Sequence, residues 1–276
     1  MTVSSHAHRA PLLRALAHHA AFSARLTWMR RHSVAVGLFA YTLPAAATIA
    51  VWQALSAVGL HPGGYAPGAL AAYTLAARLV SAVTVPTIHW QVERETTGQT
   101  FACRLLRPSG TLAGLWGEDI GRLLAGGLVA AAGTGALLLG CAAAGIARLP
   151  ALAPGRVLLA VADLPLTWLL LEAGFSAAAA QSVGWTRAGD VFYLAHAVLD
   201  LLAGVYVPLD LFPVAARRIL AFTPVPYLFA FPADLALGRT GLLPGLPLQA
   251  RWAGLLLLLA GRAWRRAIRR MRQVGD

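Results

Sequence analysis

Two stretches of this chain, residues 32–77 and 123–147, contain no acidic residue, no lysine and no arginine. A helix needs about 20 apolar residues to cross the hydrocarbon layer of a membrane, and both stretches exceed that length. Of the 276 residues, 58% are hydrophobic and 12% are charged, whereas a soluble domain carries about 25% charged residues. We therefore expect an all-α fold and a polytopic membrane protein.

The apolar blocks, separated by turns rich in Gly, Pro and charged residues, predict six membrane-spanning helices. Their expected ranges are 34–55, 68–90, 123–146, 156–180, 191–209 and 246–267. Residues 8–31 mix Leu and Phe with five arginines, which is typical of an amphipathic helix at the membrane surface. The expected organisation is an N-terminal segment (1–33), a transmembrane domain (34–267) and a basic tail (268–276).

The arginines indicate the orientation of these spans. All 23 basic residues are Arg, and they cluster at the two ends and in one loop, which argues against nucleic-acid binding. With the N-terminus inside, sixteen arginines lie on the cytoplasmic side and six outside, as the positive-inside rule requires. We expect a bacterial cytoplasmic-membrane protein with both termini in the cytoplasm.

A seventh apolar stretch, residues 219–237, is nearly long enough to span. It contains Pro224, Pro226 and Pro232, which interrupt a continuous helix. A seventh crossing would also place the Arg-rich tail outside. We expect the section 209–245 to form short re-entrant helices at the extracellular side.

The cytoplasmic section between the second and third spans, residues 91–122, combines charges with a short amphipathic segment. Glu93, Arg94 and Glu95 are followed by Gly98, and then by an apolar face of Phe101, Leu105 and Leu106. Arg107 and the helix-stopping Pro108 close the segment. Two interpretations remain open, a helix that transmits motion to a cytoplasmic partner and an ordinary solvated loop.

A second informative section begins at Ala203-Gly204, where the fifth span ends. It contains Val207-Pro208-Leu209, Phe212-Pro213, Thr223-Pro224-Val225-Pro226-Tyr227 and Leu237-Gly238-Arg239. This series resembles the ABC-2 type exporter permeases, especially the branch with a sister permease and a separate ATP-binding subunit. The Glu93-Arg94, Gly98 and Leu105-Leu106-Arg107-Pro108 pattern is similar to the same branch.

The resemblance implies an exporter subunit that works by alternating access with a second permease, identical or homologous. Residues 93–108 would couple it to an ATPase subunit, which would bind ATP and Mg²⁺, and a lipophilic or peptide-like cargo is implied. The extracellular gate would involve Pro208, Phe212, Pro213, Pro224, Tyr227 and Pro232. The chain has no lysine and therefore no G-x-x-x-x-G-K phosphate loop, so we expect no ATPase site and no bound cofactor of its own.

Four charged residues fall within the expected spans: Arg78, Asp163, Glu172 and Asp200. Such charges usually form pairs or mark function, and we hypothesise that Arg78 pairs with Glu172. An ion-coupled secondary transporter using the three acids as proton sites is the alternative function. A membrane enzyme is a weaker one, because His89, His196 and Asp200 are scattered. The N-terminal histidines are interpreted as polar residues of the amphipathic segment, and no metal site is expected.

Overall fold

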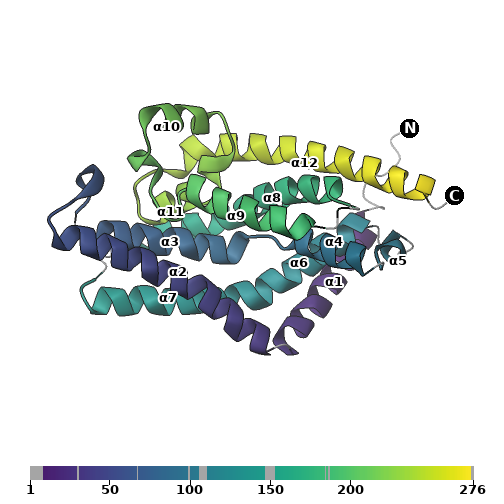
Figure 1. Ribbon diagram of the computed structural model, residues 1–276, viewed down its shortest axis with the longest axis horizontal. Helices are drawn as coiled ribbons and strands as arrows, with labels where there is room; N and C mark the ends of the chain where they lie inside the picture. Colours follow the sequence, from purple (N-terminus) through teal and green to yellow (C-terminus); the bar gives the residue numbers. More distant parts are fainter. Residues whose placement is uncertain are drawn as a thin grey trace.

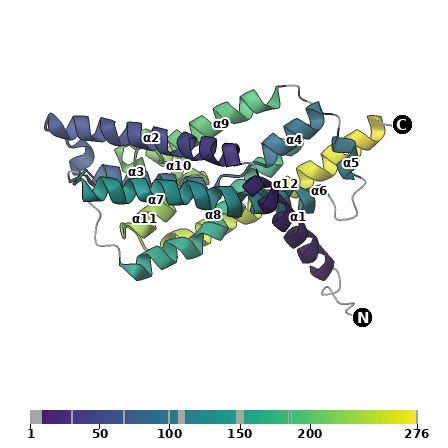
Figure 2. The same cartoon turned by 90° about the horizontal axis from the view of Figure 1, so that it is seen from below.

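A computed structural model describes most of the chain, and every regular element in the described residues is a helix (Figure 1). The described ranges are 9–29, 31–66, 68–98, 100–105, 111–146, 153–183, 185 and 187–274. The long helices lie side by side along the longest axis of the molecule, as expected for a bundle that crosses a membrane (Figures 1 and 2).

The elements follow one another as a series of antiparallel long helices with short connecting helices. The first half contains α1 (Arg9–Met29), α2 (Arg31–Ala57), η1 (Pro62–Gly64), α3 (Ala69–Thr84), α4 (Ile88–Thr97), α5 (Phe101–Leu105), α6 (Thr111–Arg122), the π-helical turn η2 (Leu123–Gly127) and α7 (Leu128–Ala143). The second half contains α8 (Pro154–Gln181), α9 (Ala188–Leu202), η3 (Leu209–Leu211), α10 (Val214–Ala221), η4 (Val225–Tyr227), α11 (Ala230–Ala236) and α12 (Leu242–Val274).

Four helical stretches among the described residues are long and apolar enough to cross a membrane. They are Leu38–Ala57, Thr111–Ala143, Pro154–Gln181 and Leu242–Met271. Two bent pairs, α3 with α4 and α10 with η4–α11, would raise the number to six if each pair were one span. The expected all-α membrane fold is thereby confirmed.

Three of the expected spans are arranged differently in the structure, and the sixth is longer than expected, because α12 runs from Leu242 to Val274. The second is broken at Val85–Thr87, where Pro86 lacks an N–H group, and α4 continues at 45° to α3. The third begins at Thr111, twelve residues before the expected start, because α6, η2 and α7 form one continuous helical stretch. The fifth, α9, ends at Leu202 after 15 residues, and Gly204 adopts φ +85° to turn the chain away.

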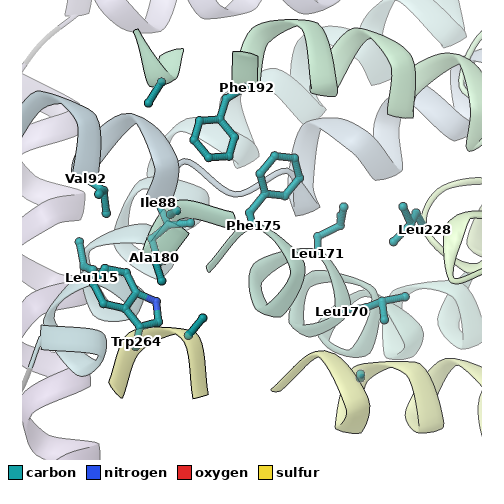
Figure 3. Packing of buried hydrophobic residues seen from close by; sticks show 14 of the residues in the cluster. Ile88, Val92, Leu115, Leu170, Leu171, Phe175, Ala180, Phe192, Leu228 and Trp264 are labelled. Atoms are coloured by element: carbon teal, nitrogen blue, oxygen red, sulfur yellow. The ribbon is translucent and has the colours of Figure 1, made fainter. Parts of the chain in front are cut away.

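The hydrophobic core surrounds α8, which packs along most of its length against α12. Leu170, Leu171 and Phe175 of α8 form its middle, and Phe192 reaches them from α9 (Figure 3). Toward the other end of the cluster, Trp264 of α12 is 1% exposed. α8 therefore contacts α12 along its length, α11 at one end and α4 at the other.

The two ends of the bundle differ in character. One end carries α4, α5, the start of α6, and the last turns of α12, while α1 leaves the bundle obliquely there (Figures 1 and 2). The opposite end carries η1 and the short helices from η3 to α11. After the roles that the family resemblance implies for their residues, we call them the coupling end and the gate end.

Candidate coupling site and buried charges

The coupling end is organised by the break before α4. Thr87 donates two hydrogen bonds to Asp119 Oδ1 of α6, from its backbone N–H (2.7 Å) and from its hydroxyl (2.5 Å). The backbone N–H of Thr87, the residue that precedes α4, therefore has its acceptor on a side chain of α6 rather than in the preceding helix. This contact holds α4 at its angle to α3.

Arg104 of α5 is the centre of a charged cluster. Its Nε–H donates to Glu95 Oε2 at 2.6 Å, and its Nη2 contacts Glu95 Oε1 and lies 3.0 Å from Glu118 Oε1. Burial alone would lower the pKa of Arg104, but the hydrogen bond to Glu95 and the charge of Glu118 raise it overall. The cluster joins α4, α5 and α6 through one guanidinium group that is always charged.

Two further contacts attach this region to the rest of the bundle. Phe101 is buried, and its ring stacks on Trp264 of α12 with centroids 6.2 Å apart and an angle of 16° between the planes. Glu93 Oε1 accepts a hydrogen bond of 2.7 Å from the backbone N–H of Gly189, at the start of α9. α5 therefore contacts α12 directly, and α4 contacts the start of α9.

The predicted coupling residues are partly brought together by these contacts. Glu93, Glu95 and Phe101 join different helices, Arg94 is exposed, and Gly98 is the C-terminal cap of α4. Leu105 is the last residue of α5, while Leu106, Arg107 and Pro108 lie outside the described residues.

Sequence reasoning missed the contribution of α1 and α6 to this site. A cleft of about 440 Å³ opens beside the α1–α6 contact. α1 lines it with residues that include His18 and Phe22, and the opposite side carries the charged residues Arg94, Glu95, Arg104 and Arg122. The signal for the α1–α6 contact is the glycine series 114, 117 and 121, because small residues permit close helix packing.

The hypothesis of an Arg78–Glu172 pair is wrong. Arg78 Nη1 lies 3.3 Å from Asp200 Oδ2 of α9, and the guanidinium carbon lies 4.2 Å from the centroid of the Tyr206 ring. Depth along the bundle explains the difference. Arg78 is nine residues from the gate-end start of α3, about 14 Å, whereas Glu172 is eighteen residues from the gate-end start of α8, about 27 Å.

The two acids of α8 have separate surroundings. Asp163 Oδ2 accepts hydrogen bonds from Thr167 (3.0 Å) and from Gln249 of α12 (3.2 Å). Glu172 is completely buried, and its neighbours in charge are Asp119 and Arg122 of α6. His196 does not pair with Asp200, since its Nδ1 instead contacts the backbone oxygen of Phe192 at 3.2 Å.

The gate end contains the short helices that the prolines predicted, and α10 and the η4–α11 stretch form an angle of 82°. Each predicted gate residue belongs to one of these elements or caps it: Pro208 and Phe212 flank η3, Pro213 and Pro224 precede α10 and η4, Tyr227 ends η4, and Pro232 is buried in α11. Their depth in a membrane stays a prediction.

An ion-pair network closes the gate end over these helices. Arg239 lies 3.0 Å from Asp210 and 3.1 Å from Asp234, and it also contacts the Tyr65 hydroxyl. Burial of the Tyr65 phenol is the largest influence on its pKa. Together with the hydrogen bond to Asp210, burial raises this pKa above its ordinary value. The network joins the η1 loop to both sides of the predicted re-entrant section.

The family model described as ABC-2 family transporter protein matches residues 43–275, which include every helix from most of α2 to α12. No curated protein and no solved structure matches the chain.

Proposed function

The chain belongs to the ABC-2 family of transporter proteins, and from this premise we propose that it is the membrane-embedded permease of an ATP-driven exporter. A second permease, identical or homologous, completes the translocation pathway. The two subunits carry a lipophilic or peptide-like cargo outward by alternating access. The complex lies in a bacterial cytoplasmic membrane with both termini of this chain inside.

The ATPase subunit docks at the coupling end, on the surface that α4 and α5 present. The observation that carries this assignment is the construction of α5. One face of this short helix is tied to α4 and α6 through Arg104, and Phe101 stacks on Trp264 of α12. A push on α5 is thus passed to long helices rather than absorbed by a loop.

ATP and Mg²⁺ bind to the partner subunit. The absence of lysine removes the phosphate-loop lysine from this chain, so hydrolysis requires another polypeptide. The Arg104 cluster transmits the motion without taking part in the chemistry.

Co-purification tests the partner directly. A tagged chain extracted in mild detergent is expected to bring an ATP-binding protein and a second permease with it. Transport by the isolated chain without ATP would contradict the proposal.

The substitution Phe101→Asp tests the coupling path. A carboxylate cannot replace the buried ring against Trp264, so we expect insertion and ATPase binding to persist while cargo-stimulated ATP hydrolysis falls at least tenfold. The matched control is Phe101→Leu, which keeps an apolar contact and should retain most of the stimulation. Full transport by Phe101→Asp would show that α5 does not couple the subunits.

A further inference from the structure

A row of polar and aromatic side chains on α8 faces a matching row on α6 near the coupling end. Trp168, Glu172 and Ser176 are spaced four residues apart and therefore lie on one face of α8. The Trp116 indole N–H donates to Ser176 Oγ at 2.9 Å, and the Trp116 and Trp168 rings meet edge to face with centroids 6.1 Å apart. The Glu172 carboxyl, on the same face of α8, interacts with the Asp119 carboxyl of α6.

The surroundings of Asp119 suit an ionised carboxylate, because hydrogen-bond donors and a guanidinium group face its Oδ1 atom. Its Oδ1 accepts the two hydrogen bonds from Thr87, and Arg122 Nη2 lies 3.9 Å from the same oxygen. The Nε2 of Gln91 is a third donor, at 3.5 Å. Asp119 Oδ2 has no donor among the described residues.

Glu172 has no such support. Its exposed fraction is 0%, and neither carboxyl oxygen has a hydrogen-bond donor among the residues that the structure describes. Gln91 Oε1 is likewise buried without a donor, whereas Arg122 Nε and Nη2 and the Trp168 indole N–H are buried donors without an acceptor among the described residues. Two carboxylates cannot hydrogen-bond each other, but a carboxylic acid can donate to a carboxylate.

The charge balance leads to the same result. Asp119 and Arg122 are the charged groups that act on the Glu172 carboxyl, and the guanidinium compensates one negative charge there; Glu118 and Arg94, which also act on Arg122, have opposite signs. A second, uncompensated carboxylate in a buried site is strongly disfavoured. Around this cluster, His89 of α4 and His196 of α9 pack on Phe175, one turn further along α8.

We propose that Asp119 and Glu172 form a proton-binding site in which the Glu172 acid donates its hydrogen to Asp119. Arg122 compensates the one remaining charge. The bound proton fastens α8 to α6 directly before the π-helical turn η2 and beside the break that begins α4. The bound proton therefore links two long helices near the coupling end. This proposal does not depend on the exporter assignment.

Infrared spectroscopy of the purified chain at neutral pH tests the site. We expect the wild-type spectrum to contain the C=O stretching band of a protonated carboxylic acid, and Glu172→Gln to remove it. Asp163→Asn is the matched control, because it removes another buried carboxyl group of the same helix and should leave the Glu172 band in place. A wild-type minus Glu172→Gln difference that shows carboxylate bands instead would overturn the proposal.

A second variant keeps the test decisive if Glu172→Gln does not fold. Asp119→Asn removes the ionised partner, so Glu172 becomes the carboxyl group that compensates Arg122, and its protonated-acid band should weaken or disappear. An unchanged band would contradict the pairing of the two groups.

The remaining occupant to exclude is a monovalent metal ion. Replacing Na⁺ and K⁺ by choline should leave the thermal midpoint of the wild-type chain unchanged. A midpoint that falls in choline for the wild type and not for Glu172→Gln would assign the site to a metal ion and overturn the proton proposal.

Discussion

The contribution of an ion pair to the stability of this chain depends on how deeply its side chains are buried. The Arg187–Asp190 pair at the start of α9 is 87% and 79% exposed in its side chains, so water screens it and it contributes little. In the Arg78–Asp200 pair the side chains are 5% and 17% exposed. Arg78 also keeps buried Nε and Nη2 groups without a partner among the described residues, so loss of Asp200 would leave the guanidinium uncompensated.

We predict that removing one member of the Arg78–Asp200 pair destabilises the bundle more than removing both. Arg78→Leu or Asp200→Leu alone should lower the free energy of unfolding by about 3 kcal/mol, because each leaves a buried charge without its partner. The double variant should lie closer to the wild type. Denaturant unfolding in detergent micelles measures these differences, and a double variant that loses the sum of the two single losses would show that the residues are not coupled.

The charge-exchanged variant Arg78→Glu with Glu172→Arg is the control for partner choice. Since these residues lie at different depths, the exchange should not recover stability over its single variants. If the exchanged variant recovered stability, the result would support the Arg78–Glu172 pair that the structure contradicts.

Among the elements, α1 is placed by its contact with α6 rather than by its own sequence. A Cβ atom on Gly121 would lie 2.1 Å from the backbone oxygen of Ala20, and one on Gly117 would lie 2.7 Å from the Cβ of His19. Ser23 Oγ also donates to the backbone oxygen of Glu118 at 2.7 Å. The glycines of α6 therefore form the surface on which α1 packs, and the cleft of the coupling end depends on that contact.

Gly121→Val is expected to separate α1 from α6. The added side chain meets backbone, which cannot move aside as a flexible side chain would, so the expected cost is about 1–3 kcal/mol. Limited proteolysis should cut α1 several times faster in this variant. Gly140→Val is the control, because a Cβ at that position of α7 meets nothing within 4 Å; equal cleavage rates in the two variants would contradict the packing role of Gly121.

At the scale of the whole molecule, the two native cysteines report on orientation. Cys103 is exposed in α5 at the coupling end, whereas Cys141 is buried in α7. Val58, which is 71% exposed, follows α2 at the opposite end. The proposed topology places the first of these positions inside the cell and the last outside.

A membrane-impermeant maleimide added to intact cells should therefore leave Cys103 unmodified until the membrane is opened. Val58→Cys, made together with Cys103→Ser, should be modified in intact cells. Labelling of Cys103 from outside would invert the topology and, with it, the location of the ATPase partner.

Much of the fold could be predicted because span length and proline position are local properties. The range of α8 was expected within two residues at each end, and the prolines at 224, 226 and 232 predicted the short helices of the gate end. The expected start of the third span is wrong because residues 91–122 are polar as a group, although Glu118 pairs with Arg104 of α5 and Asp119 accepts hydrogen bonds from Thr87.

The sequence by itself determined that this chain enters a membrane, how many apolar stretches it offers and which of them prolines interrupt, because each follows from neighbouring residues. It also supplied the family resemblance, which the match over residues 43–275 confirms. Only the tertiary structure decided that Arg78 meets Asp200, that Arg104 joins two glutamates and that Glu172 faces Asp119. Pairing between helices depends on depth and on the facing side of each helix, and both are set by packing.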